Sequence, residues 1–209
     1  MNFWQSDMRR GIFGGTFDPV HYGHLILAET CRDTCLLDEV IWLPTFQSPF
    51  KSGSQPTDAR HRLAMIDLAI AGVAEFRIDP REINRKQVSY TVETLTEMKA
   101  EFPEDELFFL IGADSLRDLP SWKEPERIVS LATIVAVNRQ AGQLGRIQSD
   151  FEALPESIRE RVQIVNMPEI GISATDLRER VEAKSSIRFL TPRPVERYIV
   201  ENNLYRASQ

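Results

Sequence analysis

The sequence is poor in histidine, in cysteine and in positive charge. Among its 209 residues are three histidines and two cysteines, and 31 acidic residues outnumber 25 Lys and Arg for a net charge of −6. General nucleic-acid binders are usually basic, so no nucleic-acid partner is expected. An anionic ligand would have to be bound by a few local cations and by backbone N–H groups.

The chain also lacks any apolar run long enough to cross a bilayer. Residues 1–10 have neither the apolar core nor the small-residue cleavage pattern of a signal peptide. We therefore expect a cytoplasmic protein without a membrane partner. Residues 1–9 are interpreted as a short N-terminal extension and residues 10–209 as one domain.

The two cysteines, Cys31 and Cys35, lie four residues apart on one expected helix face. A metal site needs further ligands, and a disulfide within a regular helix has poor geometry. Two buried, reduced thiols are the better interpretation.

Apolar runs alternate with helical patterns along the chain. Expected strands lie around Ile12-Phe13 and at 39–43, 75–79, 107–111, 133–137 and 163–167, and the segment 80–90 is expected to be a charged loop. Helical periodicity separates the strands, which favours a parallel sheet covered on both faces. The sequence predicts an α/β fold: a single doubly wound, Rossmann-like domain with a mostly parallel central sheet.

One glycine turn stands out, in the stretch from Gly11 to Leu25. Gly14 and Gly15 permit positive φ and close approach of a ligand. Asp18 is expected to be the N-cap of a helix whose first residue is Pro19.

His21 and His24 would then lie one turn apart at a helix N-terminus. Free N–H groups, the helix dipole and imidazole donors there favour a phosphate. Neither G-x-x-x-x-G-K-[ST] nor G-x-G-x-x-G is present. The alternative is a tight turn with two surface histidines.

A second helix start follows Ile172. Ser173 and Asp176 resemble a capping box, which explains two of its residues structurally. Thr175 and Arg178 are three residues apart on one face, and a hydroxyl, a guanidinium and a helix N-terminus together suit a polyphosphate. Ligands of open parallel sheets bind beyond the carboxyl ends of the strands. The segments 14–18, 44–51, 112–115 and 138–139 are therefore expected to converge.

The stretch GGTFDPVHYGHL resembles the signature of the H-x-G-H nucleotidyltransferase superfamily, most of all that of the bacterial nicotinate-nucleotide adenylyltransferases. ISATDLR is similar to the family's I-S-x-T-x-x-R motif, and the resemblance runs from about residue 10 to 206. It implies transfer of the adenylyl group of ATP to nicotinate mononucleotide, a step of NAD biosynthesis that releases pyrophosphate and yields deamido-NAD. The helix near the C-terminus is expected to serve packing only.

The resemblance also implies roles for individual residues. The catalytic set is His21, His24, Lys51 and Arg178. The ATP-binding set is Gly14, Gly15, Thr16, Phe17, His24, Gly112, Asp114, Ile172, Ser173, Thr175 and Arg178. The mononucleotide-binding set is Ser89, Tyr90, Thr91, Trp122 and Arg139. No metal ligands are expected, because Mg²⁺ would arrive with ATP. Phe50 stands where the family usually has His.

Two alternatives stay open. The chain could act on another phosphate such as phosphopantetheine, although Tyr90 and Trp122 favour a flat pyridine ring. It could also be a catalytically silent nucleotide-binding module, although both phosphate motifs are intact. The choice between nicotinate and nicotinamide, and between a monomer and a homo-oligomer, is not fixed by the sequence.

Overall fold

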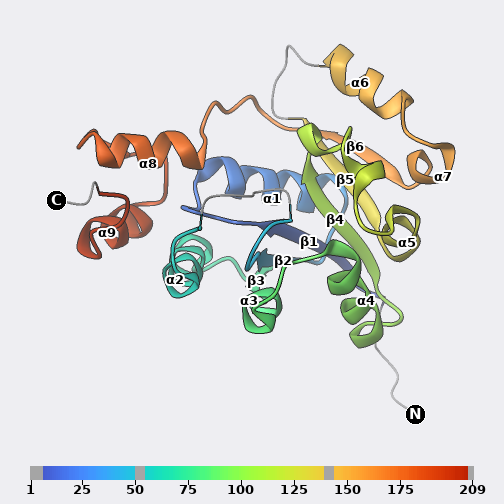
Figure 1. Ribbon diagram of the computed structural model, residues 1–209, viewed down its shortest axis with the longest axis horizontal. Helices are drawn as coiled ribbons and strands as arrows, with labels where there is room; N and C mark the ends of the chain where they lie inside the picture. The colour runs from blue at the N-terminus through green and yellow to red at the C-terminus, as the bar shows by residue number, and fades with distance from the viewer. Residues whose placement is uncertain (1–6, 50–54, 139–143, 207–209) are drawn as a thin grey trace.

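The computed structural model describes residues 7–49, 55–138 and 144–206. Its strands form one six-stranded sheet in the order β3-β2-β1-β4-β5-β6, and every neighbouring pair is parallel (Figure 1). The strands are β1 (Arg9–Gly15), β2 (Glu39–Pro44), β3 (Phe76–Ile78), β4 (Glu106–Gly112), β5 (Thr133–Asn138) and β6 (Val162–Asn166).

Helices connect these strands. They are α1 (Tyr22–Thr34), α2 (Ala59–Ile70), α3 (Arg81–Arg85), α4 (Thr91–Glu101), α5 (Pro125–Leu131), α6 (Leu144–Glu152), α7 (Glu156–Arg159), α8 (Ala174–Glu182) and α9 (Arg193–Glu201). Two short 3-10 turns, η1 (Ala113–Ser115) and η2 (Leu119–Ser121), follow β4.

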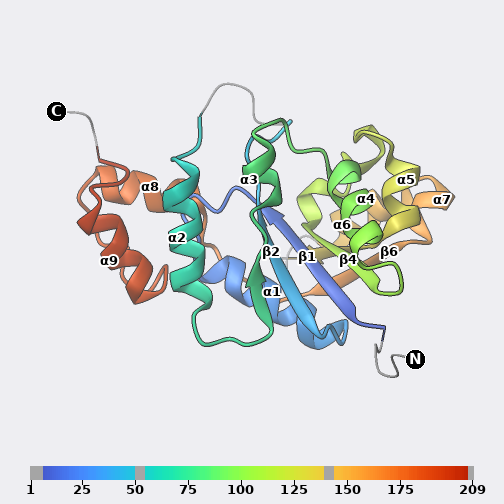
Figure 2. The same ribbon diagram turned by 90° about the horizontal axis from the view of Figure 1, so that it is seen from below.

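Successive residues of the central strands enter opposite cores, as the two-residue period of a strand requires. Ile12 joins the core beneath α4, α5 and α7, whereas Phe13 joins the core beneath α1, α2, α8 and α9. Figure 2 shows α2, α8 and α9 on one side of the strands and α4, α5 and α7 on the other. The predicted doubly wound α/β fold is confirmed, with a fully parallel sheet.

The strand order places a topological switch point beside β1. The chain passes from β1 to β2 and β3 on one side, and then crosses to β4 on the other side of β1. Connections that leave β1 and β4 in opposite directions open a crevice at their carboxyl ends. The glycine turn after β1 lies at this point.

The first helix begins later than the sequence predicts. Asp18 is not the N-cap and Pro19 is not helical: α1 begins at Tyr22, His21 is its N-cap, and the Asp18–Pro19 peptide bond is cis. The Asp18 carboxylate serves other donors, because it accepts the Thr57 N–H over 2.9 Å and a tyrosine hydroxyl from the C-terminal segment.

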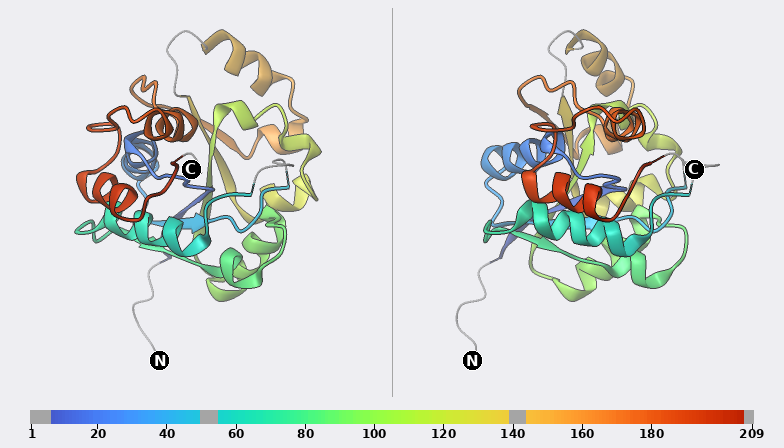
Figure 3. Two further views of the ribbon diagram at one scale, coloured as in Figure 1. Left: turned by 60° about the vertical axis from the view of Figure 1, so that its left-hand side comes forward. Right: turned by 90° about the vertical axis from the view of Figure 1, so that its left-hand side faces the viewer.

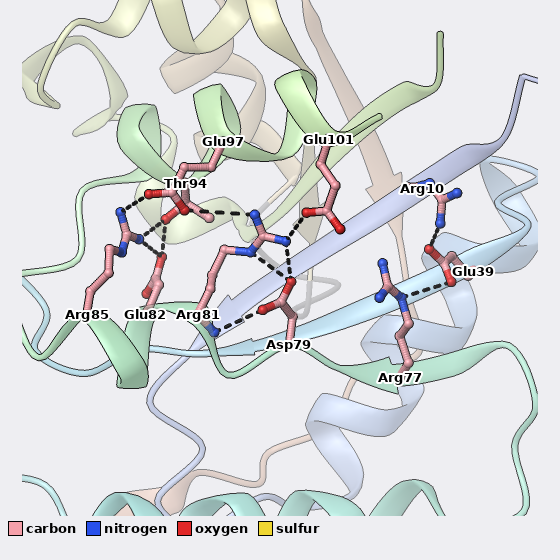
Figure 4. A network of polar contacts seen from close by, with 10 residues as sticks. All are labelled: Arg10, Glu39, Arg77, Asp79, Arg81, Glu82, Arg85, Thr94, Glu97 and Glu101. Carbon is pink, nitrogen blue, oxygen red and sulfur yellow. Dashed lines mark hydrogen bonds and ion pairs between the residues drawn. The ribbon is translucent and has the colours of Figure 1, made fainter. Parts of the chain in front are cut away.

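The segment 80–90, predicted as a charged loop, contains α3. Its Glu82 is buried and accepts a hydrogen bond of 2.8 Å from the Thr94 hydroxyl of α4. Arg81 donates to Glu101 of α4 over 2.7 Å, and Figure 4 shows further ion pairs between these two helices. Contacts with α4 therefore stabilise a helix too short to persist alone.

Cys31 and Cys35 are both buried and free. Burial raises the pKa of the Cys31 thiol to about 12 and raises the pKa of Cys35 as well. The prediction of two buried, reduced thiols is confirmed.

The two ends of the described chain are both tied to the sheet or its helices. β1 begins at Arg9, so the sheet includes a residue that the sequence assigned to the extension 1–9. Near the other end, α9 lies along α2 (Figure 3), where the Tyr198 hydroxyl and His61 Nδ1 are 2.9 Å apart.

None of the helices in the described ranges is both long and apolar enough to span a bilayer.

Candidate active site

A cleft of about 1100 Å³ lies at the carboxyl ends of β1, β2 and β4. The loops that follow these strands and the start of α8 converge on it, as the sequence predicts. Of the predicted segment 138–139, Asn138 does not line the cleft and residue 139 lies outside the described residues. The predicted site residues that line it are Gly14, Gly15, Thr16, Phe17, His21, His24, Ser89, Tyr90, Thr91, Gly112, Trp122, Ile172, Ser173, Thr175 and Arg178.

His21 and His24 lie together at the start of α1. Their rings stack with centroids 3.8 Å apart and an interplanar angle of 24°. The His21 backbone N–H donates to His24 Nδ1 over 3.3 Å, so a neutral His24 carries its proton on Nε2 and can donate it to a ligand. A Cβ at Gly23 would lie 3.0 Å from the His21 ring, which explains the small residue between the two histidines.

Phe17 shapes the glycine turn before this helix. Its φ of 50° is the left-handed region that a bulky residue seldom adopts. The ring is 2% exposed and packs edge-on against Phe13 and His24, at centroid distances of 5.2 and 5.1 Å. A Cβ at Gly15 would meet this ring at 2.8 Å, so the turn needs glycine there. Aromatic packing thus holds a strained backbone beside the cleft.

Arg178 connects the two predicted phosphate sites. Its Nη1 donates to the Asp18 carbonyl over 2.7 Å, and its Nη2 donates to the Thr175 hydroxyl over 3.3 Å. The Ser173 hydroxyl accepts the Asp176 N–H over 3.1 Å, so the predicted cap of α8 is confirmed. The guanidinium therefore ties the start of α8 to the glycine turn across 160 residues of sequence.

Tyr205 extends this connection to the C-terminal segment, which the sequence indicates only as packing. Its hydroxyl donates to Asp18 Oδ1 over 2.5 Å. Burial and the neighbouring Asp18 raise the pKa of Tyr205 above its ordinary value, which keeps the phenol a donor. Asp18 lines the cleft with 8% of its surface exposed. Neither residue has a sequence signal for this contact, because it joins positions 187 residues apart.

The other half of the cleft is aromatic. Trp122 is half-buried, and its ring stands edge-on to Phe109 at a centroid distance of 6.1 Å. Lys123 also lines this half: its Nζ lies 4.3 Å from the centroid of the Tyr90 ring and bonds to Glu93 over 2.6 Å. Flat aromatic surface beside one cation suits a planar anionic ring.

Ser89 connects two loops at this end. Its hydroxyl accepts the Phe46 N–H over 3.3 Å and is hydrogen-bonded to Glu82, whose carboxyl group also lines the cleft. Burial raises the pKa of Glu82, and hydrogen bonds from Thr94 and Ser89 oppose that effect. No local pattern in the sequence indicates Glu82, because its burial depends on the packing of α3 against α4.

Three predicted residues are not in the described lining of the cleft. Asp114 is exposed in η1 and does not line it, whereas the adjacent Ser115 does. Lys51 and Arg139 lie outside the described residues, as does Phe50.

In the parts of the chain that the structure describes, no three His, Cys, Asp or Glu side chains gather in a group that could hold a metal ion.

Comparison with known proteins agrees with this geometry. Residues 12–180 match the Cytidylyltransferase-like family. The probable nicotinate-nucleotide adenylyltransferase of Thermomicrobium roseum is 44% identical, over 95% of this chain and 92% of its own length. The probable nicotinate-nucleotide adenylyltransferase of Moorella thermoacetica is 39% identical, over 99% of this chain and 95% of its own length.

Solved structures share the fold. Plasmodium falciparum nicotinic acid mononucleotide adenylyltransferase matches with a TM-score of 0.75 when complexed with APC, at 19% identity over 95% of this chain and 97% of that one. Its complex with NaAD matches with a TM-score of 0.74 at 20% identity over the same shares. The family predicted from the glycine turn is confirmed: the chain belongs to the cytidylyltransferase-like family and, within it, to the nicotinate-nucleotide adenylyltransferases.

Proposed function

We propose that this protein transfers the adenylyl group of ATP to nicotinate mononucleotide and releases pyrophosphate, which forms deamido-NAD. The observation that carries the proposal is the bond from Arg178 to the Asp18 carbonyl, which holds two anion-suited helix starts on one cleft. The opposite half of that cleft offers aromatic surface. Relatives at 44% and 39% identity bear the name of this activity.

The reaction is an in-line attack of the mononucleotide phosphate on the α-phosphorus of ATP. The bond from that phosphorus to the β-phosphate bridging oxygen breaks as the new P–O bond forms, and pyrophosphate leaves with the electron pair. No covalent enzyme intermediate is needed, so catalysis consists of positioning and charge stabilisation.

His24 is the donor to the α-phosphate, because its Nδ1 is held by the His21 N–H and its Nε2 carries the proton. The stacked His21 supports this geometry and faces the bridging oxygen. Thr175 and Arg178 hold the β- and γ-phosphates, which become the leaving group. Lys51, which follows β2 in the sequence, adds a further cation for the phosphates.

On the acceptor side, Trp122 stacks on the nicotinate ring, and Tyr90 and Thr91 line its edge. Ser89 acts by holding the neighbouring loop through Phe46. Arg139 belongs to the acceptor site.

Mg²⁺ bound to ATP would neutralise phosphate charge, and the phosphate oxygens would supply its ligands. This fits the residues present, because Asp18, a carboxylate on the cleft, already accepts bonds from Tyr205 and Thr57. We place the protein in the cytoplasm, as a monomer or homo-oligomer, without nucleic-acid or membrane partners.

The test is pyrophosphate release from MgATP in parallel reactions with nicotinate mononucleotide, nicotinamide mononucleotide, phosphopantetheine or no acceptor. We expect the highest kcat/KM with nicotinate mononucleotide. Preferential turnover of phosphopantetheine would show that it, and not nicotinate mononucleotide, is the acceptor. If no acceptor were turned over, the adenylyltransferase activity would be refuted and nucleotide binding alone would be left.

A further inference from the structure

Arg62 of α2 is a buried arginine that the proposed reaction does not yet use. It is 1% exposed, and in the ranges 7–49, 55–138 and 144–206 it forms no ion pair within 4.0 Å of a carboxylate. Burying an unpaired charge is costly unless its donors are satisfied. Its burial lowers the pKa of Arg62, although an arginine remains charged at neutral pH. Stability alone therefore does not explain an arginine at this position.

Arg62 donates through Nε and Nη1 to three backbone carbonyls, which belong to the turn after β1 and to the connection between β2 and α2. Nη1 donates to the Thr16 carbonyl and to the Thr45 carbonyl, each over 2.9 Å, and Nε donates to the Thr57 carbonyl over 2.9 Å. Thr16 lies in the turn after β1, and Thr45 lies in the loop after β2. All three residues line the cleft. One guanidinium thus fixes the spacing between the two loops that flank the phosphate half of the site.

The bond to Thr16 also fixes the direction of the next N–H. The C=O of Thr16 and the N–H of Phe17 belong to one trans peptide group, so they point in opposite directions. With the carbonyl held on Arg62 beneath the loop, the Phe17 N–H is directed away from Arg62. Among the described residues that N–H has no acceptor. The left-handed φ of Phe17 belongs to the same local geometry.

We infer that Arg62 is a positioning residue for adenylyl transfer, which clamps the carbonyls of Thr16 and Thr45 and so aims the Phe17 N–H at the α-phosphate of ATP. This inference rests on the proposed function. An N–H held in place before the reaction stabilises developing charge without reorganisation. Arg62 itself does not touch the substrate.

The kinetic test compares Arg62→Met, Arg62→Lys and a matched control, Arg10→Met. Arg10 is also buried, but it pairs with Asp105 and Glu39 at the opposite end of β1. Arg62→Met should lower kcat by about 10²-fold, because a small misplacement of catalytic groups has that effect, and should change KM for ATP by less than about threefold. Arg62→Lys keeps the charge but lacks the planar guanidinium with its several N–H donors, so its kcat should be at least about tenfold below that of the wild type.

Arg10→Met should lower thermal stability at least as much as Arg62→Met and keep kcat within about twofold of the wild type. Equal losses of kcat in Arg62→Met and Arg10→Met would overturn the proposal, because destabilisation would explain both. Full recovery of kcat in Arg62→Lys would also overturn it, since charge alone would then suffice.

A spectroscopic test needs no turnover. The sequence contains two Thr-Phe pairs, Thr16-Phe17 and Thr45-Phe46. Labelling Thr with ¹³C at the carbonyl and Phe with ¹⁵N therefore selects the two amides that follow the clamped carbonyls. On addition of MgATP the Phe17 amide should shift, whereas Phe46, already bonded to Ser89 over 3.3 Å, should shift less.

In Arg62→Lys both resonances should move before nucleotide is added, and the ATP-induced shift of Phe17 should fall by at least about half. An unchanged Phe17 response in that variant would overturn the clamp. This readout separates the two ideas: a wild-type protein that shows the Phe17 response but transfers nothing to nicotinate mononucleotide would refute the proposed function and leave the clamp standing.

Discussion

The bond between Tyr205 and Asp18 gives a stability prediction that can be worked from the structure. Tyr205→Phe removes a hydroxyl that donates to the Asp18 carboxylate over 2.5 Å and leaves that carboxylate with the Thr57 N–H. A hydrogen bond to a charged group contributes about 1.5–3 kcal/mol to stability, so we expect the free energy of unfolding to fall by about 2 kcal/mol. In a domain of 209 residues this lowers Tm by about 4–8 °C.

The assay is thermal and urea unfolding of Tyr205→Phe beside Tyr198→Phe. The control removes a hydroxyl from the same end of the chain, where the Tyr198 hydroxyl lies 2.9 Å from Nδ1 of His61. Tyr198→Phe should lower the free energy of unfolding by about 1 kcal/mol or less. A Tyr205→Phe variant no less stable than Tyr198→Phe would refute the reasoning that the C-terminal segment anchors the glycine turn.

Other predictions concern His24, a buried acid and the thiols. His24→Ala should lower kcat by about 10²–10³-fold and raise KM for the mononucleotide far less, and steady-state kinetics that show unchanged turnover would remove it from the transition state. Because burial raises the pKa of Glu82 above 4.5, its favourable contribution is complete below that value and is lost as pH rises through the higher folded pKa. Wild type should therefore lose stability relative to Glu82→Gln in urea unfolding as the pH rises above about 4.5, and parallel pH profiles would contradict this. With its pKa near 12, Cys31 should resist iodoacetamide at pH 8 until the protein unfolds, and so should Cys35; rapid labelling of the native protein would argue against their burial.

Much of the fold follows from local patterns in the sequence. The continuous apolar run of β4 and the shorter runs of β5 and β6 predict a buried parallel sheet, and the glycine turn predicts where its ligand binds. The hydroxyl and guanidinium of Thr175 and Arg178 need only helical spacing to meet, and they do meet over 3.3 Å.

The errors have a common physical origin. Asp18 has the local pattern of an N-cap, but its partners Thr57 and Tyr205 are 39 and 187 residues away. Glu82 looks like part of a polar loop until α4 packs over it. Arg62 looks like one more charge on an amphipathic helix, and its carbonyl partners belong to loops that no local pattern brings to it. Tertiary contacts determine the structural roles of these residues, and local sequence patterns do not reveal them.

The central claim is that one cleft joins ATP to nicotinate mononucleotide. The most direct measurement is the amount of deamido-NAD formed per pyrophosphate released, in a reaction of the purified protein with MgATP and nicotinate mononucleotide. We expect equal amounts of the two products, and formation of both should fall together in His24→Ala. Pyrophosphate released without deamido-NAD, or formed equally well without the mononucleotide, would contradict it.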